Sequence, residues 1–143
     1  MQLKAKTIFL VVLGVVFAGC ALSPPTETAR VTSDKPMKEA AQLIEKQAKS
    51  CWERSATMWK DGVTIDARMS LHDSALISAA RWSSDIGIQD KFLIIEVMGK
   101  PDDTSVVTIN EGDYACGLSG SCTSLGLGAD VIRWLDGDPA CGN

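Results

Sequence analysis

Hydrophobic and polar positions change their period several times along the chain, and each change predicts a new element. Between residues 37 and 52, apolar or small side chains recur every three or four positions, which is typical of one face of an amphipathic helix. These positions are Met37, Ala40, Ala41, Ile44, Ala48, Cys51 and Trp52. Ser33 or Asp34 can cap the helix, and Pro36 fits its first turn because the N–H groups there have no partner within the helix.

The period then falls to two, which predicts strands. Residues 63–70 alternate between apolar and polar side chains, as a half-buried strand does. Further strands are expected at 75–82, 92–98 and 105–110, and the dense apolar run at 92–98 suits a central strand. A short last helix is expected at 129–135.

One segment fits two structures. Asp61-Gly62 can form a tight hairpin turn after a strand at 56–60, or Gly62 can end a longer first helix. We favour the hairpin, because the threonine and tryptophan of this segment favour strands. Short connections imply antiparallel pairing. The predicted fold is therefore α+β, with one long N-terminal helix packed on a small antiparallel meander sheet and a short C-terminal helix, in a single domain at 34–143.

The first 20 residues are typical of an export signal. Two lysines precede an apolar run at 7–18, which is shorter than the roughly 20 residues of a membrane span but suits the hydrophobic region of a signal peptide. The run ends in Phe17-Ala18-Gly19-Cys20, which resembles the lipobox of bacterial lipoproteins with Phe17 in place of the usual leucine. The alternative is an ordinary cleaved signal in which Cys20 has no role.

The lipobox resemblance implies a membrane anchor. Residues 1–19 would be removed, and Cys20 would carry three acyl chains, more than stable anchoring needs. Ala21 stands where inner-membrane lipoproteins typically carry aspartate, so the resemblance points to the outer membrane. We expect the domain on the periplasmic face, although the sequence leaves the cell surface open.

The segment after the anchor is expected to be a lipidated flexible tether at 20–33. Its polar residues cannot bury a core, and Pro24-Pro25 biases it toward extended conformations. At about 3.1 Å per residue, residues 21–33 would hold the domain at most roughly 40 Å from the membrane.

Charge narrows the choice of partners. Loss of the two signal-peptide lysines lowers the basic count from 14 to 12, against 18 acidic residues, which leaves a balance of −6. A negative chain of this kind argues against nucleic acid and against an electrostatic hold on anionic lipid headgroups.

Four cysteines remain after the anchor, and in an exported chain an even number predicts two disulfides. We favour Cys51–Cys141 with Cys116–Cys122. The alternative, Cys51–Cys116 with Cys122–Cys141, is nearly as consistent with the spacing. A zinc site is not expected, since there is no Cys-x₂-Cys pair and only one histidine.

No catalytic set stands out in the sequence, and we expect neither an enzyme nor a cofactor nor a metal. His72-Asp73-Ser74 has the residue types of a triad, but adjacent side chains diverge and cannot share one imidazole. The stretch 117–121 fails the nucleophile-elbow pattern at its last position. The acidic residues near turns do not follow the calcium-loop pattern.

Two places are candidate contact surfaces. One is the loop between Cys116 and Cys122, with Gly117, Ser119 and Ser121. The other is the strand end at Arg81 and Trp82, because arginine and tryptophan are enriched at binding hot spots.

These features support two hypotheses of different classes. The first is an outer-membrane lipoprotein that acts by contact with an envelope protein in assembly, maintenance or sensing. The second is an inhibitor or immunity protein against an envelope-active enzyme such as a lysozyme or a toxin, because its negative charge would attract a basic target.

Overall fold

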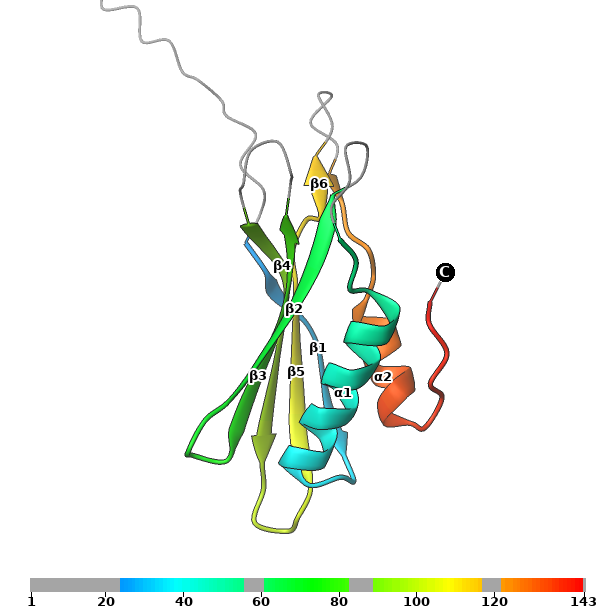
Figure 1. Cartoon of the computed structure of the whole chain (residues 1–143). Coiled ribbons are helices and arrows are strands. Elements are labelled where there is room, and N and C mark those ends of the chain that lie inside the picture. Colours follow the sequence, from blue (N-terminus) through cyan, green and yellow to red (C-terminus); the bar gives the residue numbers. More distant parts are fainter. Residues whose placement is uncertain (1–23, 56–60, 83–88, 117–121, 143) are drawn as a thin grey trace, which may run out of the picture.

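The computed structural model describes residues 24–55, 61–82, 89–116 and 122–142. Figure 1 shows a twisted sheet with two helices on one side and a small hairpin at one end. In chain order the elements are β1 (Thr26–Ser33), α1 (Met37–Cys51), β2 (Gly62–Met69), β3 (Ser74–Trp82), β4 (Gln89–Gly99), β5 (Ser105–Glu111), β6 (Ala115–Cys116), β7 (Cys122–Thr123) and α2 (Gly128–Leu135).

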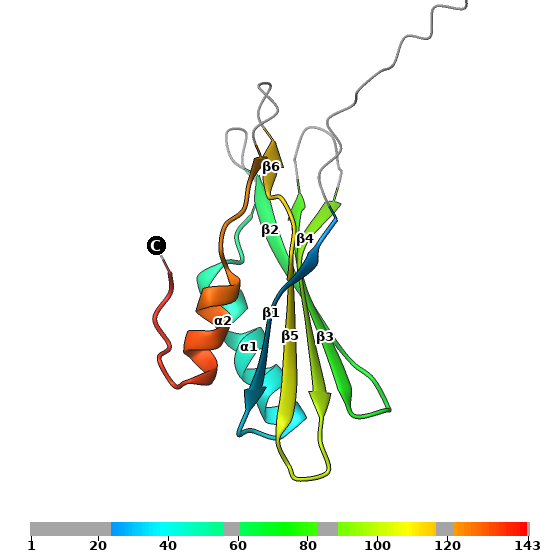
Figure 2. The ribbon, with the colours of Figure 1, turned by 180° about the vertical axis from the view of Figure 1, so that it is seen from behind.

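The main sheet has five antiparallel strands in the order β1-β5-β4-β3-β2. Strands β2 to β5 follow one another as a meander, and β1 adds to the free edge of β5. The pair β6 and β7 forms a separate two-stranded ribbon. Both helices lie against the same face of the main sheet, as the front and rear views agree (Figures 1 and 2).

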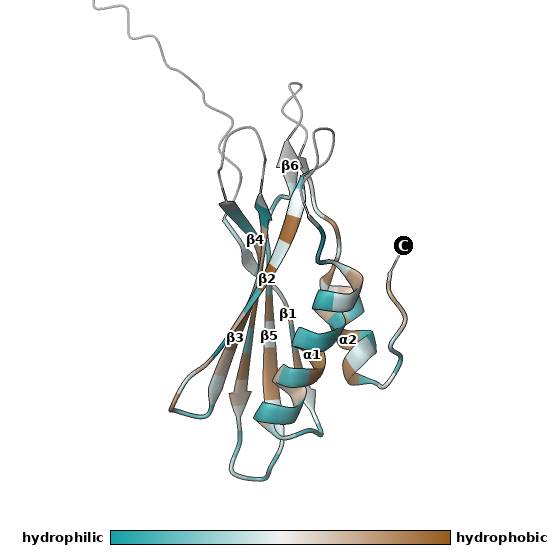
Figure 3. Cartoon of the chain, in the orientation of Figure 1, coloured by the Kyte–Doolittle hydropathy of each residue, from teal (hydrophilic) through white to brown (hydrophobic). Residues whose placement is uncertain are grey.

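The core lies between the helices and this face. Hydrophobic residues follow the central strands (Figure 3). Their buried valine, leucine and isoleucine side chains belong to one core cluster with residues of both helices. Helix α1 turns a row of small residues to the sheet, which lets its backbone approach closely. Helix α2 adds the buried Val131, Trp134 and Leu135. The buried residues of α1 are Ala40, Ala41, Ile44 and Ala48.

The predicted fold class is wrong in its proportions. The molecule is mainly a five-stranded antiparallel sheet with two short helices, and α1 has 15 residues where a long helix was expected. Its helical hydrogen bonding ends when the Trp52 N–H donates to the Ala48 carbonyl. Two residues later, the backbone of Arg54 exchanges two hydrogen bonds with Val63, the start of the sheet.

The individual elements agree better with the sequence. The predicted strands at 63–70, 75–82, 92–98 and 105–110 correspond to β2, β3, β4 and β5, and the last helix corresponds to α2. Strand β4 is central, as its apolar run indicates. The strand expected at 56–60 lies outside the described residues.

The predicted tether is too long. Residues 26–33 form β1, which pairs with β5 from Thr26↔Glu111 to Ser33↔Ser105. Alternate residues of this segment, including Val31 and Ser33, turn toward the helix side, where β5 and α2 supply partners. Because β1 and β5 are far apart in the sequence, local sequence patterns could not predict this pairing.

The described residues contain one disulfide, Cys51–Cys141, where two were expected. It joins the end of α1 to the segment after α2. Cys116 and Cys122 are register partners in the β6–β7 ribbon, but their side chains lie outside the described part, so their pairing stays a prediction. In the described ranges, no helix is long and apolar enough to cross a membrane.

Candidate functional site

The face of the sheet opposite the helices has no element over it in the described structure (Figure 2). The strand register brings one row of side chains together across all five strands of this open face. From β1 to β2 the row is Arg30, Thr108, Glu96, Leu76 and Arg68. Charged residues therefore lie on both sides of an exposed leucine.

Exposed apolar side chains gather at one end of the sheet. The end is defined by the β2–β3 and β4–β5 turns, and we call it the turn end. Of the six exposed large apolar residues in the described chain, four lie here, and we call them the turn-end cluster: Met69 (47% exposed), Leu71 (99%), Leu76 (37%) and Met98 (56%). Three of the four, all but Leu71, line a groove of about 390 Å³ together with Arg68, Ser70, Ser74 and Glu96.

Two ion pairs of the open face are exposed to solvent. The Arg68 Nε lies 2.8 Å from an Asp66 carboxylate oxygen, and the Arg30 guanidinium lies 2.7 Å from Glu27. The hydrogen bond to Glu27 raises the pKa of Arg30 above its ordinary value. Exposed pairs of this kind contribute little to stability, so they are free to exchange partners on binding.

The opposite end of the sheet is the loop end, where Arg81 and Trp82 lie. Trp82 is 40% exposed and borders a groove of about 500 Å³ with Arg54 and Thr64. Arg81 is less accessible, because its guanidinium lies 3.5 Å from Asp90 and 3.8 Å from Asp61. As expected from strand alternation, the two residues point to opposite sides of β3.

Tyr114 contacts two arginines and a phenylalanine inside the loop end. Its hydroxyl accepts a 2.7 Å hydrogen bond from Arg54, and its ring lies 5.8 Å from the Arg81 guanidinium carbon. Phe92 packs edge-on against the same ring, with 5.1 Å between centroids. Both arginines are therefore engaged, which makes Trp82 the more available member of the predicted pair.

The other predicted contact residues are not placed. Gly117, Ser119 and Ser121 lie outside the described residues. His72 is exposed in the β2–β3 turn, next to Asp73, whose positive φ of 51° forms the turn.

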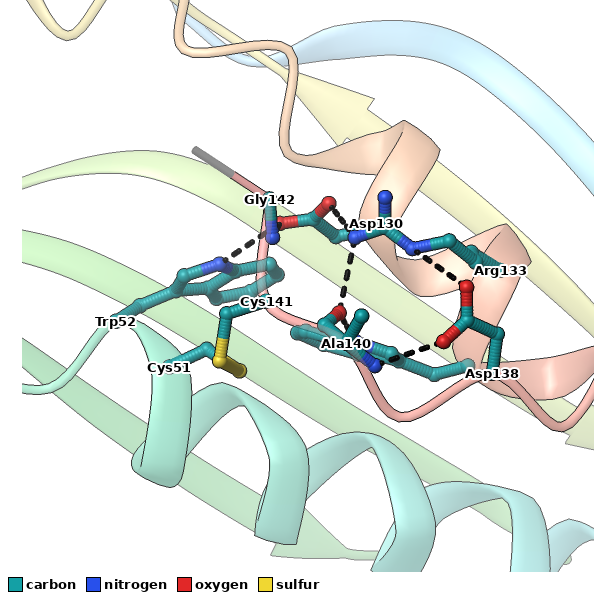
Figure 4. Close-up of a disulfide and its surroundings, with 9 residues drawn as sticks. Cys51, Trp52, Asp130, Arg133, Asp138, Ala140, Cys141 and Gly142 are labelled. Carbon is teal, nitrogen blue, oxygen red and sulfur yellow. Dashed lines mark hydrogen bonds and ion pairs between the residues drawn. A yellow bond between two sulfur atoms is a disulfide. The ribbon is translucent and has the colours of Figure 1, made fainter.

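Beside the disulfide, a polar cluster holds the C-terminal segment against the two helices (Figure 4). The buried Asp130 carboxylate accepts hydrogen bonds from the Trp52 indole at 3.2 Å and from the Gly142 N–H at 3.2 Å, and it also pairs with Arg133. The Trp134 indole and Arg133 both donate to the Ala140 carbonyl.

This cluster has a structural role. The Asp130 carboxylate accepts bonds from Trp52 and Gly142, and a Cβ added at Gly142 would overlap this carboxylate, so any other residue there requires the Asp130 side chain to shift. The Trp52 and Trp134 rings pack together with 4.7 Å between centroids. Sequence reasoning placed Trp52 in the core but missed Asp130, because an aspartate in the first turn of a helix ordinarily faces water.

No group of three or more potential metal ligands is present among the described residues. Likewise, no family model, no curated protein and no solved structure matches this chain. The open face, the turn-end cluster and the loop end are therefore interpreted from their own chemistry.

Proposed function

We propose that this protein is a lipoprotein, anchored through Cys20 to the periplasmic face of the outer membrane, that binds another envelope protein through the turn-end cluster. The observation that carries the proposal is that three exposed apolar side chains, Met69, Leu76 and Met98, line one groove at the turn end, with Leu71 exposed in the β2–β3 turn. Scattered single apolar residues are ordinary on a soluble protein, whereas a contiguous group marks an interaction site.

The position of the cluster supports a protein partner. β1 begins at the loop end, where Thr26 pairs with Glu111, and it runs toward the turn end. An anchor at Cys20 therefore enters at the loop end, and the turn-end cluster lies at the far end of the sheet. A surface held away from the bilayer meets other proteins of the envelope more readily than lipid.

The chemistry of the groove indicates what it would bind. Its volume of about 390 Å³ falls within the roughly 300–1,000 Å³ of ligand clefts, so it accommodates a few apolar side chains. Met69 and Met98 adapt to partner shape because their side chains are unbranched and flexible. Arg68 and Glu96, one of each charge, border the groove and favour a partner with an apolar segment between opposite charges.

The proposal is tested by crosslinking in living cells with tagged full-length protein. We expect one prominent envelope partner in the wild type and its loss in Leu76→Asp and Met98→Asp. Gln42→Asp, on the exposed side of α1, is the matched control and should keep the partner. A Cys20→Ser protein should lose both the membrane and the partner. Retention of the partner in Leu76→Asp and Met98→Asp, with both variants folded, would refute the proposed surface.

The inhibitor or immunity hypothesis stays an alternative that rests on the −6 balance. Its inserting loop, 117–121, lies outside the described residues. Salt-sensitive binding to a cationic hydrolase would favour it over the adaptor role.

A further inference from the structure

The short connection between Cys20 and the sheet restricts how the domain stands on the membrane. Because β1 begins at Thr26, residues 21–25 are the whole link. Fully extended, five residues span at most about 18 Å. The eight residues of β1 alone extend about 26 Å from the loop end toward the turn end. An orientation with the turn end on the bilayer would need a longer link than the chain has.

The loop end must therefore lie near the lipid surface. The start of β1, the start of β2, the end of β3, the start of β4 and the end of β5 meet there, since Trp82 pairs with Gly62 and Gln89, and Thr26 pairs with Glu111. The β6 strand lies at the same end (Figure 1). Among the described residues at these strand ends, the exposed aromatic side chain is Trp82.

Tryptophan is the side chain best suited to this position. Its ring is largely apolar but its indole N–H needs a polar partner, and for this reason tryptophan is enriched at the boundary between lipid and water. Of the neighbouring arginines, Arg81 is paired with Asp61 and Asp90, and the Arg54 guanidinium donates to the Tyr114 hydroxyl.

We infer that the loop end is a membrane-contact surface on which Trp82 sits among the headgroups of zwitterionic phospholipid. The inference rests on the Cys20 anchor of the proposed function. The contact holds the domain upright and points the turn-end cluster away from the bilayer. Since the indole carries no charge and Arg81 is paired with two carboxylates, the contact of Trp82 itself does not need anionic lipid.

Depth-dependent fluorescence quenching tests the inference on the lipidated protein. The wild type and Trp82→Phe are reconstituted into phosphatidylcholine vesicles whose acyl chains either carry bromine or do not. The difference in tryptophan fluorescence between the wild type and Trp82→Phe is assigned to Trp82. We expect bromine to remove about half of this emission or more, as for an aromatic residue at the headgroup level.

Two matched reporters complete the experiment. The difference between the wild type and Trp134→Phe reports a core tryptophan, and Leu76→Trp in the Trp82→Phe background reports the turn end; neither should be quenched. Quenching of Trp82 no stronger than that of Leu76→Trp would overturn the membrane contact.

Flotation of the same vesicles separates the two proposals. If the lipidated wild type floats but Trp82 is not quenched, only the membrane contact is refuted. The proposed anchor and partner surface are then unaffected. If the wild type does not float and mass spectrometry finds Cys20 unmodified, the proposed anchor is refuted, and the membrane contact that depends on it is refuted as well.

Discussion

The two faces of the sheet are built from the same strands, yet one face is buried beneath the helices and the other is exposed to solvent. Ile77 and Leu76 are neighbours on β3, but Ile77 is 2% exposed beneath the helices and Leu76 is 37% exposed on the open side. On β4, Val97 is fully buried and Met98 is 56% exposed. The comparison shows that strand alternation assigns stability to one face and leaves the other face available for contact.

The means of stabilisation differ in the same way. The covered side is held by apolar burial, a disulfide and the buried Asp130 cluster. The described ion pairs of the open side, Arg30–Glu27 and Arg68–Asp66, are exposed to solvent. Substitutions should therefore change the free energy of unfolding on the covered side and partner binding on the open side.

The largest effect is expected from the disulfide. Cys51 and Cys141 are 90 positions apart, and removal of a crosslink over such a loop costs about 2–5 kcal/mol in the free energy of unfolding. We predict this loss for Cys51→Ser and Cys141→Ser by chemical denaturation. The double variant serves as the control and should lose no more than either single variant, because both break the same bond. Additive losses would contradict a Cys51–Cys141 pair.

The next largest effect contrasts neighbouring residues. Ile77→Ala leaves a cavity in the core and should cost about 2–5 kcal/mol, whereas Leu76→Ala should cost about 1 kcal/mol or less. Partner crosslinking should show the reverse order, with a loss for Leu76→Ala and little change for folded Ile77→Ala. Equal destabilisation by both substitutions would show that Leu76 is packed as tightly as Ile77 in solution, which would contradict an open face.

A smaller effect is expected at the C-terminal cluster. Gly142→Ala places a Cβ against the Asp130 carboxylate, and Asp130→Asn weakens the hydrogen bond from the Trp52 indole. Each should cost about 1–3 kcal/mol, as for a disturbed buried polar group. Limited proteolysis should cut the segment after α2 faster in Gly142→Ala than in the wild type. Unchanged stability and cleavage would mean that the disulfide alone holds this segment.

The smallest effect is expected at the exposed β4–β5 turn. The Thr104 hydroxyl donates a 2.6 Å hydrogen bond to Asp102, and this bond holds the pKa of the Asp102 carboxyl below its ordinary value. Its contribution to stability is therefore present above the ordinary carboxyl pKa and is lost as the pH falls through the lowered one. Thr104→Val should raise the pKa of Asp102 in an NMR titration and leave partner binding unchanged. A pKa that does not move would show that Thr104 is not the donor in solution.

Much of the fold follows from local sequence patterns. The alternation in β2, the apolar run of β4 and the three-to-four spacing of α1 each act over a few residues, so their elements are predictable. The Cys51–Cys141 bond was the favoured one of two pairings that the cysteine spacing left open, and only the structure decides between them. β1 could not be predicted in this way. Its partner β5 lies more than 70 residues away in the sequence, and the two prolines before β1 are more typical of an unpaired, extended segment.

The candidate site was less predictable than the fold. Arg81 and Trp82 are adjacent in sequence, so a strand pattern alone places them at one end of the sheet. The turn-end cluster draws its members from β2, the β2–β3 turn, β3 and β4. Only the register of these strands shows that Leu76 and Met98 border the same groove.

Site-specific photo-crosslinking from the two sides of the molecule tests the central claim most directly. A photoreactive amino acid replaces Leu76 or Met98 on the open face and Gln42 or Lys46 on the exposed side of α1, in the full-length protein in cells. The account predicts one envelope partner crosslinked from both open-face positions and from neither helix position. A partner captured equally well from α1, or captured only from α1, would contradict it.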